Sequence, residues 1–210
     1  MQNNDTQAHQ GSQPEPAPRR LDLVIEKDLL RRFFKFMEQG FVVPTQPGCS
    51  IEELLCRQLH IKDEYLEERI QTIFLNGKPV DDVKTALITD GSTLALSAAM
   101  PGLVGATLRK GGQYARLRRQ ISLRAEGNRP AHSGAGQVVL KFFNLVAQEL
   151  GPSFLQNGIW IKGRHLQDFF QRHGDDIARG TTFAQVDAKR IEANRLAEVN
   201  WGDNLVFLQL

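Results

Sequence analysis

The sequence predicts an α+β protein made of two similar units, and three observations lead to this prediction. Short apolar runs of strand length occur with a stretch of helical periodicity in each unit. Residues 75–97 align without gaps to residues 186–208, at a constant offset of 111. A segment rich in Gly and Arg separates the units. We expect a disordered N-terminal segment (1–20), a first domain (21–100), a connector and linker (101–136) and a second domain (137–210).

The first unit begins with two predicted strands. Leu21–Ile25 is an apolar run that follows a segment rich in Gln, Asn and Pro. That preceding segment has too little apolar surface to offset the entropy of ordering. A second apolar run, Phe41–Val43, follows Gly40 and is stopped by Pro44, which has no N–H for a strand ladder.

A helix is predicted to begin at Ser50. Ser50 and Glu53 have the spacing of a capping box, in which each side chain accepts a hydrogen bond from the backbone N–H of the other residue. The apolar residues that follow at helical spacing form one face: Ile51, Leu54, Leu55 and Leu59.

Two further strands are expected to complete the first unit. Ile70–Leu75 is a strand closed by Asn76-Gly77, a dipeptide that favours a tight hairpin turn. Asp90-Gly91 turns the chain again into Leu94–Leu96. The predicted order is therefore strand, strand, helix, strand, strand.

The second unit repeats this order. In the aligned blocks Lys78, Ala86, Gly91 and Leu94 are identical to Lys189, Ala197, Gly202 and Leu205. Upstream, residues 51–55 match 166–170, and residues 40–43 match 158–161. Three matching blocks in one order predict an internal duplication.

The repeated pattern resembles the β-grasp, or ubiquitin-like, fold, and is most similar to the small sulfur-carrier proteins of molybdopterin and thiamine synthesis. The residues that carry the resemblance are 74–80 (FLNGKPV) and 90–96 (DGSTLAL). In the second unit, Val139–Phe143 through Glu149–Gly151 is similar to that family's opening strand and loop. The resemblance implies two tandem β-grasp repeats, and its motifs are turns, which indicate fold rather than activity.

The same resemblance implies a carrier tail that ends in Gly-Gly, whose free carboxylate is activated and then carries sulfur. This chain ends in Val206–Leu210, which has the composition of a buried strand. Its Gly-Gly pair is Gly111-Gly112, which 98 residues follow. A carrier role would therefore require cleavage after Gly112.

The connector has a basic composition that the net charge of +2 conceals. Residues 101–136 contain seven basic residues and one acidic residue, against nine basic and thirteen acidic in residues 21–100. The candidate binding residues are Arg109, Lys110, Arg116, Arg118, Arg119 and Arg124. Several glycines leave the backbone unusually free, and residues 113–123 have the spacing of an amphipathic helix.

Two interpretations of this connector are open. In the first, the basic side chains bind an anion, a nucleic acid or an acidic protein. In the second, they pair with the acidic first unit, and the glycines only let the chain cross between units.

Several kinds of chemistry are not expected. No apolar run approaches the roughly 20 residues that span a bilayer, and no phosphate-binding glycine motif is present. Cys49 and Cys56 lack the spacing of metal or redox pairs, and His165, Asp168 and His173 are poorly spaced for a metal. We therefore expect no membrane association, cofactor, metal or catalytic residue, and a reducing, cytoplasmic location.

The predicted function is a non-catalytic tandem ubiquitin-like module that binds a protein partner, in sulfur transfer or cofactor assembly, through the open face or edges of its sheets. The alternatives are a nucleic-acid or anion-binding module acting through the connector, and a carrier processed after Gly112. Bulky aromatic residues are expected in the core, with an exposed subset available to a partner: Phe142, Phe143, Trp160, Phe169, Phe170 and Trp201.

Overall fold

A computed structural model describes residues 18–99, 102–110, 112 and 134–210. The first segment forms β1 (Arg19–Ile25), α1 (Leu30–Gln39), β2 (Phe41–Thr45), π-helical turns at Glu53–Gln58 and Tyr65–Arg69, β3 (Thr72–Leu75), β4 (Lys78–Pro79) and β5 (Thr93–Ser97). A short helix, α2 (Gly102–Leu108), follows. The second segment forms β6 (Gly136–Phe143), α3 (Leu145–Asn157), β7 (Ile159–Lys162), α4 (Gly163–Arg179), β8 (Thr181–Val186), β9 (Lys189–Arg190) and β10 (Leu205–Gln209).

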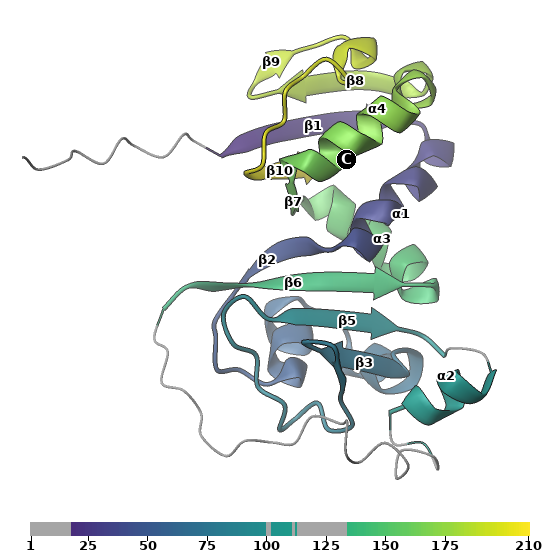
Figure 1. The fold of residues 1–210 in the computed structure, drawn as a ribbon, viewed down its shortest axis with the longest axis vertical. Coiled ribbons are helices and arrows are strands. Elements are labelled where there is room, and N and C mark those ends of the chain that lie inside the picture. Colours follow the sequence, from purple (N-terminus) through teal and green to yellow (C-terminus); the bar gives the residue numbers. More distant parts are fainter. Residues whose placement is uncertain (1–17, 100–101, 111, 113–133) are drawn as a thin grey trace, which may run out of the picture.

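The described strands form one ten-stranded mixed sheet in the order β4-β3-β5-β6-β2-β7-β10-β1-β8-β9 (Figure 1). The α+β class is therefore confirmed. No helix in the described part of the chain is long and apolar enough to cross a lipid bilayer.

Local signals in the first segment are confirmed by this structure. β1, β2, β3 and β5 lie at the four runs predicted as strands. The capping box is formed, because the Glu53 N–H donates to Ser50 Oγ at 3.1 Å and the Ser50 N–H donates to Glu53 Oε2 at 2.8 Å. After this turn the helix continues with wider π-helical spacing, in which the Leu59 N–H donates to the carbonyl of Leu54.

The sequence offset of 111 also relates the two edge hairpins. Phe74 pairs with Pro79 in the β3–β4 hairpin, and Gln185 pairs with Arg190 at the same register in β8–β9. Residues 76–77 and 187–188 have positive φ angles in both turns, as type I′ hairpin turns require.

The two segments exchange strands within this sheet. β6 lies between β5 and β2, parallel to β5 and antiparallel to β2. β1 lies between β8 and β10, antiparallel to β8 and parallel to β10. The parallel and antiparallel pairings follow the same sequence outward from the β2–β7 pair on both sides, but β6 and β5 on one side correspond in position to β10 and β1 on the other. Residues 21–100 and 137–210 thus interleave in one sheet.

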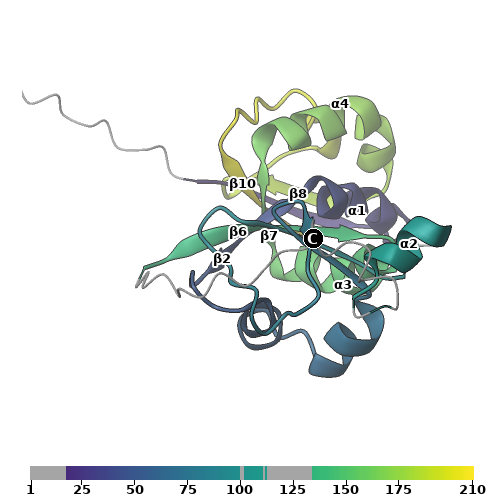
Figure 2. The ribbon, with the colours of Figure 1, turned by 60° about the horizontal axis from the view of Figure 1, so that its bottom comes forward.

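Helices bury one face of the sheet. α1 and α3 pack closely where Gly151 meets Phe34, because a Cβ on Gly151 would lie 3.1 Å from that ring. Phe33 and Phe36 of α1 contact Phe169 of α4, with ring centroids 5.0 and 4.7 Å apart. The sheet twists strongly, so α4 lies in front of its strands in Figure 1, while the π-helical turns lie behind theirs. Figure 2 shows the same twist of the sheet in a view turned by 60°.

Three local expectations are corrected by the structure. The sequence did not predict α1, and it placed Glu149–Gly151 in a loop, whereas these residues lie in α3. The tight packing of Gly151 against α1 explains this helix, since tertiary contacts outweigh the low helix propensity of glycine. Residues 102–108 form α2 instead of a free loop, with Gly105 buried.

Candidate functional site

The basic residues predicted as a binding site are only partly placed by the structure. Those that lie outside the described residues are Arg116, Arg118, Arg119 and Arg124, together with Gly111. Arg109 is exposed after α2, and the N–H of Gly112 donates to its carbonyl at 3.2 Å. Of the predicted set, the structure therefore places only Arg109, Lys110 and Gly112.

Lys110 is held against its own chain. Its Nζ donates to the carbonyl of Leu66 at 2.8 Å, and its backbone N–H donates to the carbonyl of Gln71 at 2.7 Å. Burial lowers the pKa of Lys110, and the nearby Glu67 carboxylate opposes that shift. The start of the connector is thus docked on the first segment.

The other face of the sheet offers a more continuous surface. Along β2, β6 and β10 every second side chain is buried, and most of those between them are partly exposed. Directly paired residues form a row across six strands of this open face. This central row consists of Thr93, Val139, Val42, Trp160, Phe207 and Arg20.

The middle of the central row is apolar and aromatic. The rings of Trp160 and Phe207 meet edge to face, with centroids 5.1 Å apart. The guanidinium of Arg20 lies 4.8 Å from the centroid of Phe207, within the range of a cation–π contact. The row therefore joins an apolar centre to a cation at one end.

Two glycines let the central row pack onto the backbone. Gly40 precedes β2 with φ +108°, and a Cβ there would lie 2.9 Å from Cγ1 of Val139. Gly158 precedes β7 with φ +89°, and a Cβ there would lie 2.0 Å from Cζ of Phe207. The same close packing thus occurs before β2 and before β7, in blocks that the sequence alignment had already paired.

A shallow apolar groove of about 280 Å³ opens on this face. It is lined by Pro18, Val42, Pro44, Gly136, Gln137, Trp160 and Leu205. The groove crosses the seam between β2 and β7, so both segments contribute to it.

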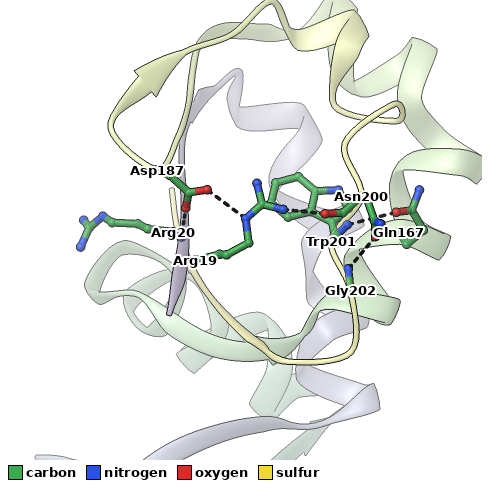
Figure 3. Close-up of polar contacts among 7 residues, drawn as sticks. All are labelled: Arg19, Arg20, Gln167, Asp187, Asn200, Trp201 and Gly202. Carbon is green, nitrogen blue, oxygen red and sulfur yellow. Dashed lines mark hydrogen bonds and ion pairs between the residues drawn. The ribbon is translucent and has the colours of Figure 1, made fainter. Parts of the chain in front are cut away.

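Consecutive arginines on β1 connect this face to the rest of the fold, and Figure 3 shows their side chains pointing in opposite directions. Arg19 Nε donates to Asp187 Oδ2 at 2.9 Å, and its guanidinium lies 5.2 Å from the ring centroid of Trp201. The backbone N–H of Arg20 donates to Asp187 Oδ1 at 2.8 Å. Burial acts to raise the pKa of Asp187, but these hydrogen bonds hold it below its usual range.

The loop that carries Trp201 is fixed by further hydrogen bonds. Gln167 Oε1 accepts from the N–H of Trp201 at 3.3 Å, and Asn200 Oδ1 accepts from the N–H of Gly202 at 3.0 Å (Figure 3). Gly163 packs under the same loop, since a Cβ there would lie 2.3 Å from the carbonyl oxygen of Trp201. The start of β1 is therefore held between this loop and the β8–β9 turn.

The Arg20 side chain is positioned on the open face by its neighbours. Its Nε donates to both carboxylate oxygens of Asp22 at 2.8 and 2.9 Å, and its Nη2 donates to Gln209 Oε1 at 2.6 Å. The hydrogen bond to Asp22 raises the pKa of Arg20 further. The guanidinium thus has a defined orientation although half of the side chain is exposed.

Other basic side chains border the central row. Lys141 and Lys162 each lie two positions beyond a row residue and therefore on the same face. The Asp22 carboxylate on this face is already bonded to Arg20. The basic side chains Arg20, Lys141 and Lys162 thus form a positive margin of the central row, which complements an acidic partner.

The sheet edges are less suited to docking than the sequence analysis expected. β4 and β9 are the two edge strands, and each has two residues. β4 contains Pro79, and β9 consists of Lys189 and Arg190. Short edges with proline or charge disfavour the addition of another strand.

The cysteines do not form a reactive pair. Gln58 Nε2 donates to the Sγ of Cys49 at 3.2 Å, and burial raises the pKa of that thiol. Burial also raises the pKa of Cys56 to about 12, so its thiol is protonated near neutral pH. Among the described residues, no group of three or more His, Cys, Asp or Glu side chains is placed to hold a metal ion.

Sequence reasoning missed most of the central row. Arg20 was placed in the N-terminal disordered segment, yet β1 begins at Arg19. The alternation of polar Arg20 and Asp22 with buried Leu21 and Leu23 was the signal for an earlier strand start. Of the six aromatic residues expected in the core, four are buried (Phe142, Phe169, Phe170 and Trp201), and Phe143 and Trp160 are partly exposed.

Comparisons of the chain with protein-family models, with curated protein sequences and with solved structures gave no match. The chemistry of the open face is therefore the basis for assigning a function. It combines a partly exposed aromatic pair, a shallow apolar groove and positively charged bordering side chains, on strands from both segments.

Proposed function

We propose that the protein is a non-catalytic module of two β-grasp (ubiquitin-like) repeats that binds a partner protein through the open face of its sheet. The central row carries this proposal. Trp160 and Phe207 are partly exposed in the middle of a sheet whose other face is buried. Aromatic and arginine side chains are enriched at protein interfaces, and an exposed apolar surface with a polar border is typical of them.

The hairpins related by an offset of 111 support the duplicated β-grasp unit. The glycines that precede β2 and β7 support it as well, because they have the same role in each half. In this proposal β6 joins the strands of the first repeat, between β5 and β2, and β1 joins those of the second, between β10 and β8, so the repeats share one continuous face. The two places are not equivalent, since β6 lies next to β2 whereas β1 lies next to β8. That face is wider than one unit alone would provide.

Charge complementarity indicates what the groove binds. The occupant is a partner protein that inserts an apolar side chain into the groove and places acidic side chains beside the basic residues that border it. The positive margin formed by Arg20, Lys141 and Lys162 repels a second copy of the same face. Residues 113–133 contain five arginines and one glutamate, so their charge does not complement the margin either. The sulfur-carrier resemblance makes an enzyme of sulfur transfer or cofactor assembly the first class of partner to test.

The described residues favour neither alternative function. Anion binding by the connector would use Lys110, whose ammonium group already donates to Leu66. A carrier processed after Gly112 would need a mobile tail, whereas Lys110 is hydrogen-bonded through both its backbone and its side chain.

Photo-crosslinking in the native host tests the docking proposal. A photoreactive amino acid replaces Val42 on the open face, and in a matched control it replaces Gln171, which is exposed on α4. We expect a discrete adduct from position 42 that is lost when Trp160→Ala is added. Equal adducts from both positions, or none from position 42, would refute docking through this face.

A further inference from the structure

We infer that Arg20 recognises a carboxylate of the partner, and that this carboxylate lies two residues from an apolar side chain that enters the groove. The inference rests on the proposed function and specifies the chemistry of its partner. It is carried by the hydrogen bonds of Arg20 and by the position of the groove residue Leu205 on the neighbouring strand β10.

Arg20 has hydrogen-bond donors that its neighbours do not use. An arginine guanidinium carries five N–H donors in one plane. Nε binds Asp22, and Nη2 binds Gln209 and lies 2.8 Å from Asp22 Oδ1. Among the residues that the structure describes, Nη1 has no hydrogen-bond partner. Its two N–H groups are therefore available to a carboxylate from outside the chain.

The guanidinium is also ordered before any partner binds. Phe207 supports one of its faces at 4.8 Å, and Asp22 and Gln209 fix its plane from neighbouring positions. A long arginine side chain that is already ordered loses less entropy when it binds. A surface arginine without such contacts does not have this advantage.

The distance from Arg20 to the groove sets the spacing in the partner. Leu205 lines the groove, and Phe207, two residues further along β10, pairs directly with Arg20. Residues two apart on a strand share a face and are separated by about 6.6 Å. An extended partner segment has the same repeat, so an apolar side chain in the groove places the residue two positions away near Arg20. We therefore expect the pattern apolar-x-acidic.

A peptide selection with the full chain tests this pattern. Random 12-residue peptides on phage are selected against the wild type, Arg20→Gln, Val42→Glu and the control Arg31→Gln, which removes an exposed arginine of α1. We expect the wild type and Arg31→Gln to enrich peptides with Asp or Glu two residues from a bulky apolar residue. A synthetic peptide from this set should bind Arg20→Gln at least about 10-fold more weakly by calorimetry.

The outcomes separate the inference from the proposed function. If enriched peptides lack the acidic residue, or bind Arg20→Gln as tightly as the wild type, the inference is overturned while docking on the face stands. If Val42→Glu binds the same peptides unchanged, or if no peptide is enriched, docking on this face is overturned too. Arg20→Lys keeps the charge and loses the planar fork, so intermediate affinity is expected. Unchanged circular dichroism and urea midpoints show that each variant is folded.

Discussion

Replacement of Gly158 by alanine tests the packing that builds the central row. Gly158 ends α3 with φ +89° and ψ 144°, a region that other L-amino acids rarely adopt. A Cβ at this position would lie 2.0 Å from Cζ and 2.5 Å from Cε1 of Phe207. The ring, the strand or both must therefore move, and Phe207 would lose its contacts with Arg20 and Trp160.

Two contributions set the size of the effect. A residue held in such a sparsely populated backbone region costs about 1–3 kcal/mol. Forcing an extra methyl group into a packed site costs typically about 1–3 kcal/mol. We expect Gly158→Ala to reduce the free energy of unfolding by about 2–6 kcal/mol, a large part of the roughly 5–15 kcal/mol of a native protein.

Gly77→Ala is the matched control, because Gly77 also has a positive φ (+77°) but nothing lies within 4 Å of a Cβ there. It should lose only the backbone contribution, about 1–2 kcal/mol. Urea unfolding followed by far-ultraviolet circular dichroism gives both values by linear extrapolation. Equal losses for the two variants would refute the reasoning, because Phe207 could not then lie over Gly158.

The remaining predictions concern the strand exchange, an ion pair and the thiols. A protease site inserted in residues 113–133 and cut in the folded protein should leave the two fragments together on size exclusion, because β6 and β1 each lie among strands of the other segment. Hydrogen bonding to Arg69 lowers the pKa of Glu149 despite burial, so the stabilisation exists above the unfolded pKa and is lost as the pH falls through the folded value. The urea midpoints of the wild type and Glu149→Gln should therefore differ most near pH 7 and converge below about pH 4. Burial raises the pKa of Cys49 and Cys56, so iodoacetamide at pH 8 should modify them more slowly in the folded than in the unfolded chain.

Each of these has a contrary result. Fragments that separate without denaturant would contradict the interleaved sheet. A midpoint difference that does not change with pH would mean that the Glu149 charge contributes nothing to stability. Alkylation at equal rates before and after unfolding would show that neither thiol is shielded.

Local structure could be predicted from the sequence where its cause lies within a few residues. The capping box between Ser50 and Glu53 and the hairpin turn at residues 76–77 are of this kind. α1 belongs with them, since Phe33, Phe36 and Met37 have the spacing of one helix face. It was missed although the signal was present.

The strand exchange could not be predicted in the same way. Apolar alternation shows which side chains of a strand are buried, but it does not show which strand lies beside it. Arg20 and Phe207 are paired across β1 and β10, yet nearly the whole chain separates them in sequence. A β1 that paired within its own segment would have the same alternation. The domain division at 21–100 and 137–210 followed the repeat and could not show that its strands interleave.

The candidate site depended on that same long-range pairing. Trp160 was one of the six aromatic residues of which some were expected to be exposed. The sequence could not show that it lies in a row, because that depends on its pairing with Val42 and with Phe207. The connector, by contrast, has a charge that is conspicuous in the sequence itself. In the structure, the described part of that connector is bound to its own chain through Lys110.

Fluorescence quenching of Trp160 in the full chain tests the central claim most directly, because docking requires that a partner can reach the open face. The chain has two tryptophans, Trp160 and the buried Trp201. Subtracting the emission of Trp160→Phe from that of the wild type isolates Trp160. We expect acrylamide to quench this component several-fold more efficiently than that of Trp201, and iodide to exceed caesium because the margin is positive. A blue-shifted Trp160 component that neither quencher reaches would show that the face is covered, and would contradict the account.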